Sequence, residues 1–148
     1  GGYIMKKLYY SAVTYMALAL ISGVFFREFT KLNGIYETTT LGKVHGHLFS
    51  LGFIVFLMAL LFEKTCQIAQ DDMFQFFFIT YHIGLGVSAT AMTVRGVLSI
   101  LELKGSLELS SGLDASISGI SGMGHIVMSI GLVLFVLILK NRLLKPSA

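Results

Sequence analysis

Residues 117–139 read ISGISGMGHIVMSIGLVLFVLIL, a run of apolar and small residues that contains no Asp, Glu, Lys or Arg. A helix needs about 20 mostly apolar residues to cross the hydrocarbon core of a bilayer, so this stretch predicts a membrane-spanning helix. Because lipid satisfies no backbone polar groups, a helix is the expected conformation of such a segment. The one ionisable side chain in this run is His125.

Three further stretches of this kind precede it, at residues 8–26, 41–62 and 73–94. Together the four predict an all-α fold, an integral membrane four-helix bundle that forms a single domain over residues 1–148. The composition agrees, because 55% of the 148 residues are hydrophobic and 13% are charged, whereas about a quarter of the residues in soluble domains are charged.

Lysine and arginine near the ends of the spans predict their orientation, since cytoplasmic ends carry more of these residues. With both termini inside, one side carries Lys6, Lys7, Lys64, Lys140, Arg142 and Lys145. The other side carries Arg27, Lys31, Lys43, Arg95 and Lys104. The difference is small, and the clusters at the two ends of the chain favour the N-in, C-in arrangement. We expect the protein to reside in the bacterial cytoplasmic (inner) membrane.

The connection between the third and fourth spans runs from Gly96 to Ser116 and is the longest of the three. Its leucine-rich half, Leu98 to Leu109, predicts a short amphipathic helix along the membrane interface.

The basic residues form no stripe of the kind that binds nucleic acid. Since no carboxylate pair and no nucleophile with an acid or base partner is evident, we assign no catalytic residue.

All four histidines fall inside the predicted spans, where ionisable groups are costly and usually face the bundle interior. His45 and His47 lie on the second span, His82 on the third and His125 on the fourth. At 1.5 Å of rise per residue, His45, His47 and His125 lie about 6–12 Å below the outer boundary of the membrane. His82 enters from the other side and lies near the middle.

Helical spacing separates the two histidines of the second span. The face of His45 also holds small residues that let a neighbouring helix approach, so we expect His45 to point inwards. The face of His47 suits lipid or an interfacial contact, because it holds larger apolar side chains: Leu51, Ile54, Met58 and Leu61. His82 and His125 share their faces with small and polar residues, and we expect both to point inwards.

A neutral imidazole ligates iron, copper or zinc through one nitrogen while the other is held by a nearby acceptor. Two histidines from different helices at matching depth suit a haem b group, and His45 with His125 meets this requirement. His47 or His82 would assist. Three basic residues of the outer side would neutralise the propionates: Lys43, Arg95 and Lys104. This hypothesis predicts a membrane haem-binding protein for electron transfer, gas or redox sensing, or haem handling.

Two alternatives stay open at this point. The same histidines, His45, His47, His82 and His125, would instead bind copper or zinc without porphyrin, or they would only hydrogen-bond within a structural bundle that binds a protein partner. Besides the lipid bilayer, we expect a homo-oligomer, in which equivalent histidines of two subunits would hold the haem between them. The haem hypothesis also implies a redox partner.

The chain from about Lys7 to Leu144 resembles an uncharacterised family of small bacterial four-helix membrane proteins, a domain of unknown function. The stretches that carry the resemblance are LGKVHGHLF (41–49) with the Glu63-Lys64 pair, VRG (94–96) and DASISGISGMGH (114–125). The resemblance implies the four-helix membrane fold and implies no activity.

A shorter resemblance concerns His45-Gly46, followed by Phe49 and an apolar helix. This is similar to the second helix of haem–copper oxidase subunit I, where the histidine of the pair ligates the low-spin haem, and it implies that role for His45. The spacing His45-x-His47 with Gly52-Phe53 resembles the membrane haem–copper proteins of the nitric-oxide response. The chain has four predicted helices rather than twelve and no adjacent histidine pair for copper. The resemblance therefore implies haem binding rather than reduction of oxygen or nitric oxide.

Overall fold

The structure, a computed structural model, describes residues 1–144, so that Lys145 of the predicted inner side lies outside the described residues. Within that range every regular element is a helix. In chain order these are α1 (Gly2–Asn33), α2 (Leu41–His47), the π-helical segment η1 (Leu48–Ile54), α3 (Val55–Cys66), the 3-10 helix η2 (Ile68–Gln70), α4 (Phe74–Leu103) and α5 (Ser111–Leu143). Since α2, η1 and α3 follow one another without a break, they form one rod.

Four rods are long and apolar enough to cross a membrane: Gly2–Asn33, Leu41–Cys66, Phe74–Leu103 and Ser111–Leu143. The predicted all-α fold with four spans is confirmed. The rods have 26 to 33 residues and are therefore about 40–50 Å long, which exceeds the roughly 30 Å of a hydrocarbon core. The predicted spans are shorter than the rods because hydropathy marks only the part that lies in hydrocarbon. The N-in, C-in orientation stays a prediction.

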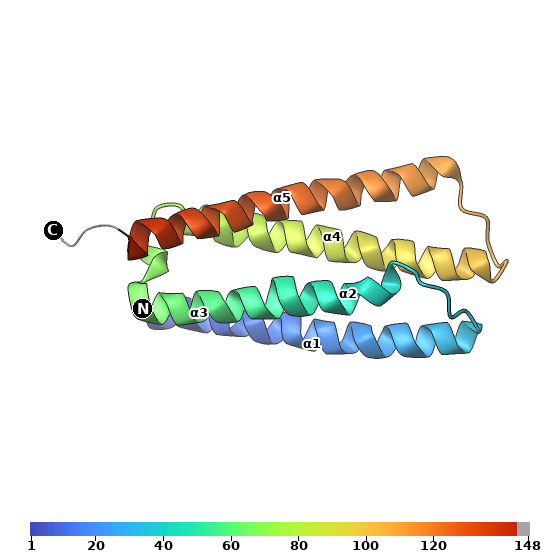
Figure 1. Cartoon of the computed structure of the whole chain (residues 1–148), viewed down its shortest axis with the longest axis horizontal. Coiled ribbons are helices and arrows are strands. Elements are labelled where there is room, and N and C mark those ends of the chain that lie inside the picture. Colours follow the sequence, from blue (N-terminus) through green and yellow to red (C-terminus); the bar gives the residue numbers. More distant parts are fainter. Residues whose placement is uncertain (145–148) are drawn as a thin grey trace.

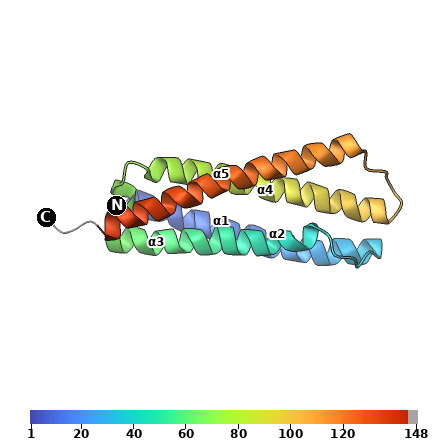
Figure 2. The same ribbon diagram turned by 45° about the horizontal axis from the view of Figure 1, so that its top comes forward.

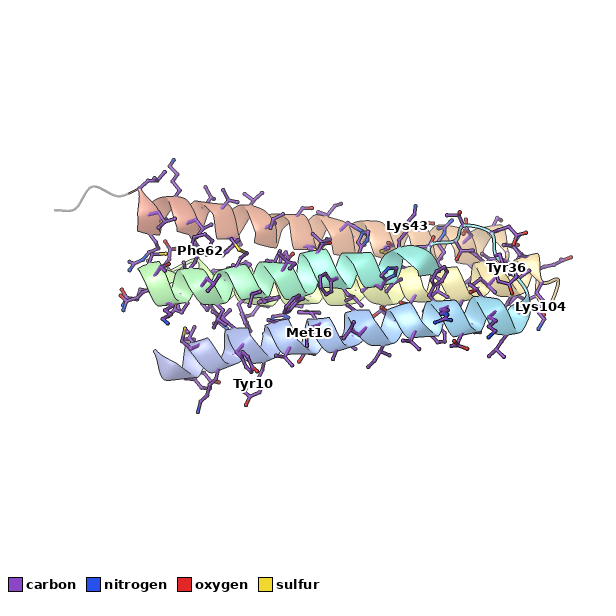
Figure 3. All side chains as sticks on the ribbon, turned by 60° about the horizontal axis from the view of Figure 1, so that its bottom comes forward. Tyr10, Met16, Tyr36, Lys43, Phe62 and Lys104 are labelled. Carbon is purple, nitrogen blue, oxygen red and sulfur yellow. The ribbon has the colours of Figure 1, made fainter. Side chains whose placement is uncertain are left out.

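The rods are arranged as two pairs. α4 packs against α5, the two separating towards the connection between them, and α1 packs against the rod formed by α2, η1 and α3 (Figures 1 and 2). The N-terminus, the C-terminal end of α5 and the connection from α3 to α4 lie at one end of the bundle, which we call the terminal end. The two longer connections lie at the other end, the loop end, where Figure 3 labels Tyr36, Lys43 and Lys104.

The approach of α4 to α5 is close enough that backbone meets backbone. A Cβ atom added to Gly84 of α4 would lie 2.2 Å from the backbone nitrogen of Met128 of α5. In lipid the hydrophobic effect does not drive helices together, so small residues that permit such contacts are a main source of association. The same glycine therefore fixes the register between the two helices.

An aromatic cluster joins the two pairs of rods. Phe56 of α3 is fully buried, and its ring centre lies 5.6 Å from that of Tyr81 on α4. Phe77 of α4 stacks on Phe135 of α5 at 4.9 Å. The Tyr81 hydroxyl donates a hydrogen bond of 2.5 Å to the carbonyl oxygen of Leu51 in η1. This bond attaches the widened π-helical segment to the first third of α4.

The interfacial helix predicted over Leu98 to Leu109 is wrong. Residues up to Leu103 continue α4, because Ile100 is fully buried and keeps the helix against the bundle. The chain then turns at Gly105, whose φ of 77° lies in the left-handed region that favours glycine. An extended connection leads to Ser110, which caps α5 by accepting a 3.2 Å hydrogen bond from the Leu113 amide.

The close approach at Gly84 leads to a first prediction. We expect Gly84→Ala to destabilise the protein by about 1–3 kcal/mol, because the new methyl group must displace the α5 backbone. Gly119→Ala is the matched control on α5, since a Cβ there would meet nothing within 4 Å. The control should be neutral or stabilising by up to about 1 kcal/mol, the difference in helix propensity. Thermal unfolding in detergent measures both. Equal unfolding temperatures for the two variants would contradict the packing described.

Candidate functional site

Two histidines from different rods meet in this fold. His47, the last residue of α2, and His125, in the middle of α5, have ring centres 5.8 Å apart and ring planes at 84° to each other. Both side chains are half-buried. The two rods are far apart in the sequence and belong to different pairs, so the contact forms where the two pairs meet.

Backbone carbonyls determine which ring nitrogen carries hydrogen. His125 Nδ1 lies 2.7 Å from the carbonyl oxygen of Ser121, and His47 Nδ1 lies 3.2 Å from that of Lys43. Because a carbonyl oxygen only accepts, each Nδ1 donates, and the lone pair of each neutral ring is on Nε2. No group within residues 1–144 hydrogen-bonds either Nε2 atom. A metal-binding histidine has this arrangement, with one nitrogen held and the other free.

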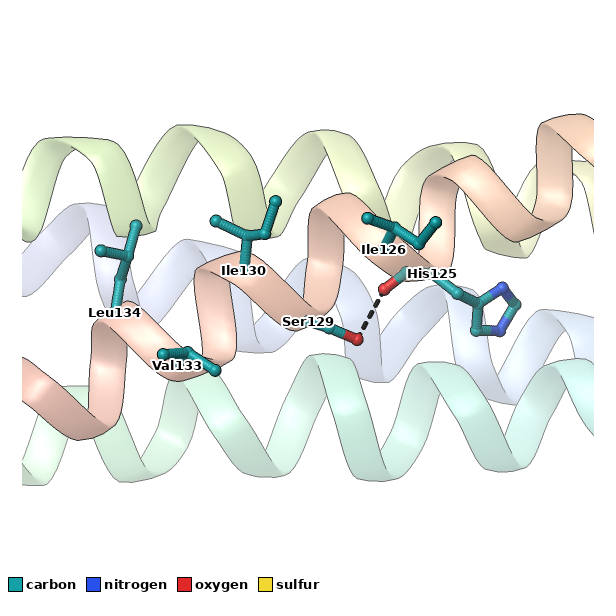
Figure 4. Close-up of a pocket in the computed structure, with 6 residues that line it drawn as sticks. All are labelled: His125, Ile126, Ser129, Ile130, Val133 and Leu134. Atoms are coloured by element: carbon teal, nitrogen blue, oxygen red, sulfur yellow. Dashed lines mark hydrogen bonds between the residues drawn. The ribbon is translucent and has the colours of Figure 1, made fainter.

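An apolar pocket of about 440 Å³ lies beside His125 (Figure 4). The residues that line it are His125, Ile126, Ser129, Ile130, Val133 and Leu134. The hydroxyl group of Ser129 is not available to a ligand, because it donates a 2.7 Å hydrogen bond to the carbonyl oxygen of His125. All six residues belong to α5, and Ile126, Ile130 and Val133 are each more than half exposed, so the pocket is an open apolar surface beside His125.

His45 does not join this pair. Its side chain is exposed, and a Cβ added to Gly23 of α1 would lie 3.7 Å from the His45 Cβ. His45 and His47 thus flank a buried stripe that contains Val44 and Leu48, one towards α1 and the other towards α5. The inward position predicted for His45 is wrong, whereas His47 makes the interfacial contact that its face left open. In an α-helix each residue advances by about 100°, so this spacing does not predict which residues share a face across the wider η1 segment. Small residues on a face also do not indicate which neighbouring helix packs against it.

His82 belongs to a separate network between α1 and α4. Its Nδ1 lies 2.6 Å from the Tyr15 hydroxyl, and its Nε2 lies 3.2 Å from Ser11 Oγ. Ser11 donates its only hydrogen to the Lys7 carbonyl at 2.8 Å, so it accepts from Nε2, and Nδ1 accepts from Tyr15. The ring also stacks on Phe56 at 4.4 Å. His82 points inwards as predicted, and both of its nitrogens are already used.

The three cations predicted to neutralise propionates have different surroundings. Arg95 forms an ion pair with Asp114 at 2.9 Å and donates a hydrogen bond to Ser118. Lys104 Nζ donates a 3.0 Å hydrogen bond to Asn33 and so joins the end of α4 to the end of α1. The Lys43 side chain is exposed and has no such partner within residues 1–144. Lys43 precedes His47 by one helical turn and is therefore the cation available beside the pair.

The structure does not bring the four histidines together. Among the described residues, no three side chains of His, Cys, Asp or Glu lie close enough to hold a metal ion. A structural zinc site uses four protein ligands, whereas His47 and His125 supply two. The site as it stands therefore suits a group that brings most of its own ligands.

Sequence reasoning missed Tyr15 and Ser11 as partners of His82. The two residues are four positions apart on α1, so helical spacing does place both on one face. Their partner is 67 and 71 residues away along the chain. No pattern within a single span indicates such a pairing.

The fold and the histidine pair define a class, a four-helix protein with membrane-spanning rods that holds two imidazoles where its rod pairs meet. The chain belongs to the family described as a protein of unknown function (DUF2871), whose family model matches residues 5–142. This confirms the resemblance to an uncharacterised four-helix family. No curated protein and no solved structure matches the chain. The shorter resemblance to haem–copper proteins stays a prediction.

A second prediction concerns the His82 network. We expect Tyr15→Phe to destabilise the protein by about 0.5–1.5 kcal/mol, because it leaves His82 Nδ1 without its donor at membrane depth. Unfolding in detergent is the measurement. His82→Phe and the double variant complete a double-mutant cycle, in which the two losses should not add. Strictly additive losses would show that the two side chains do not interact.

Proposed function

We propose that this protein binds a haem b group within the membrane, with His47 and His125 as its axial ligands. The observation that carries the proposal is the meeting of two half-buried imidazoles from different rods, each with a free Nε2. An iron porphyrin brings four ligands of its own, and histidine is its common axial ligand. A pair of histidines therefore supports haem better than zinc, which takes three or four protein ligands.

The spacing of the pair supports the same assignment. The ring centres of His47 and His125 are 5.8 Å apart, close enough for one bound group to contact both. The pocket beside His125 offers an apolar surface to a macrocycle. Lys43 offers a positive charge to a propionate. In this arrangement His47 takes the ligand role that the sequence resemblance implied for His45.

His47 and His125 would together hold the group, which would supply one-electron redox chemistry. Such a group exchanges electrons without binding a further ligand, so electron transfer is the role that we infer for the site.

The third prediction tests the proposal by absorbance spectroscopy. Protein purified from haem-sufficient cells, or reconstituted with haem in detergent, should show a Soret band and sharp α and β bands after reduction. His47→Ala and His125→Ala should each abolish the low-spin spectrum while the helical circular dichroism is kept. His45→Ala is the matched control, two residues from His47 but facing α1, and it should bind haem like the unaltered protein.

The same measurements separate the alternatives. If haem leaves no Soret band on the unaltered protein, or if His47→Ala binds it normally, the assignment is wrong. Copper found by elemental analysis without a Soret band would favour a porphyrin-free site on the same pair. Absence of both, with the protein folded, would leave the histidines as packing residues.

A further inference from the structure

A groove follows the seam between α1 and α4 on another side of the molecule. At the terminal end it is a cavity of about 710 Å³, and it continues towards the loop end as a second cavity of about 360 Å³. Tyr15, Leu18 and Gly86 line both. Between Lys6 and Phe25 the groove follows α1 for about 28 Å. That length is close to the thickness of a hydrocarbon core.

The mouth of the groove is positively charged. Lys6 and Lys7 line it beside Tyr3 and Tyr10. The Lys7 ammonium lies 4.8 Å from the ring centre of Phe78 and 5.3 Å from that of Tyr3, so aromatic faces hold it over the groove. No Asp or Glu lines either cavity, and neither lysine forms an ion pair within residues 1–144. The charge at the mouth therefore lacks a counter-charge from the described chain.

The interior of the groove suits a hydrocarbon chain. The polar groups of its wall at Ser11, Tyr15 and His82 bind one another and offer no free donor. Gly86 is exposed, and a Cβ added there would meet nothing within 4 Å. The space beside Gly86 is thus open to an apolar occupant, which would not disturb the bonded groups at Ser11, Tyr15 and His82.

We propose that this groove binds one acidic phospholipid, with the phosphate on Lys6 and Lys7 and an acyl chain along Leu18 and Gly86. Charge complementarity at the mouth selects the headgroup, and the apolar seam selects the chain. The proposal is independent of haem binding, since none of these residues lies at the pair formed by His47 and His125.

The first test compares lipids by native mass spectrometry of the detergent-solubilised full chain. Phosphatidylglycerol should bind as a single tight adduct and more strongly than phosphatidylcholine with the same acyl chains. The variant K6Q/K7Q should lose roughly 30-fold in affinity for phosphatidylglycerol, as expected for two lysines near an anionic headgroup. The variant K64Q/K140Q removes the same charge from the same end of the bundle and should keep the affinity within about twofold. Equal binding of the two lipids, or an equal loss in the control, would overturn the proposal.

The second test concerns the acyl chain. Gly86→Leu fills the groove and should abolish the tight adduct, while Gly119→Leu, at an equally open position on α5, should not. Helical circular dichroism checks that both variants fold. Glycerol phosphate, which has the headgroup charge without acyl chains, should not displace the lipid. Normal phosphatidylglycerol binding to Gly86→Leu, or displacement by glycerol phosphate, would show that charge alone makes the site and that the groove does not.

Discussion

The contact between Gly84 and the Met128 backbone is the constraint on which the other features depend. Met128 follows His125 by less than one helical turn, so the register between α4 and α5 sets the position of the His125 ring. The opposite face of α4 carries His82 and Gly86 and lies towards α1. α4 therefore packs against α5 through the face that carries Gly84 and forms the groove with α1 through the face that carries Gly86. In lipid, where apolar side chains gain little by leaving the solvent, this steric fit replaces hydrophobic burial.

Hydrogen bonding to carbonyl groups sorts the histidines into two kinds. Polar groups at membrane depth need partners, because lipid supplies none. His47 and His125 each satisfy one nitrogen through a carbonyl on the preceding turn, which leaves the second nitrogen free. His82 satisfies both nitrogens through hydroxyl groups of α1. The need for hydrogen-bond partners in lipid thus leaves His47 and His125 with a nitrogen available to a ligand and His82 with none.

The parts of the structure that depend on local sequence could be predicted, and the parts that depend on neighbouring helices could not. Hydropathy located all four spans, since each span meets lipid on its own, and polar or small neighbours in sequence correctly placed His82 inwards. The partner of His125 could not be predicted, because the face that α2 turns to α5 depends on the path of the whole chain and on the π-helical segment η1. The interfacial helix failed for a related reason. Leu98 to Leu103 are amphipathic because they continue along the bundle, not because they lie on the membrane.

The arrangement in pairs has a consequence for assembly. The chain consists of two helical hairpins, one formed by α1 with the α2–η1–α3 rod and the other by α4 with α5. Each hairpin joins two rods that are neighbours in the sequence. The histidine pair and the lysine-lined groove both lie where one hairpin meets the other. A molecule bound at either place would contact both hairpins. It would therefore stabilise their packing against each other, and this stabilisation would increase with its concentration in the membrane.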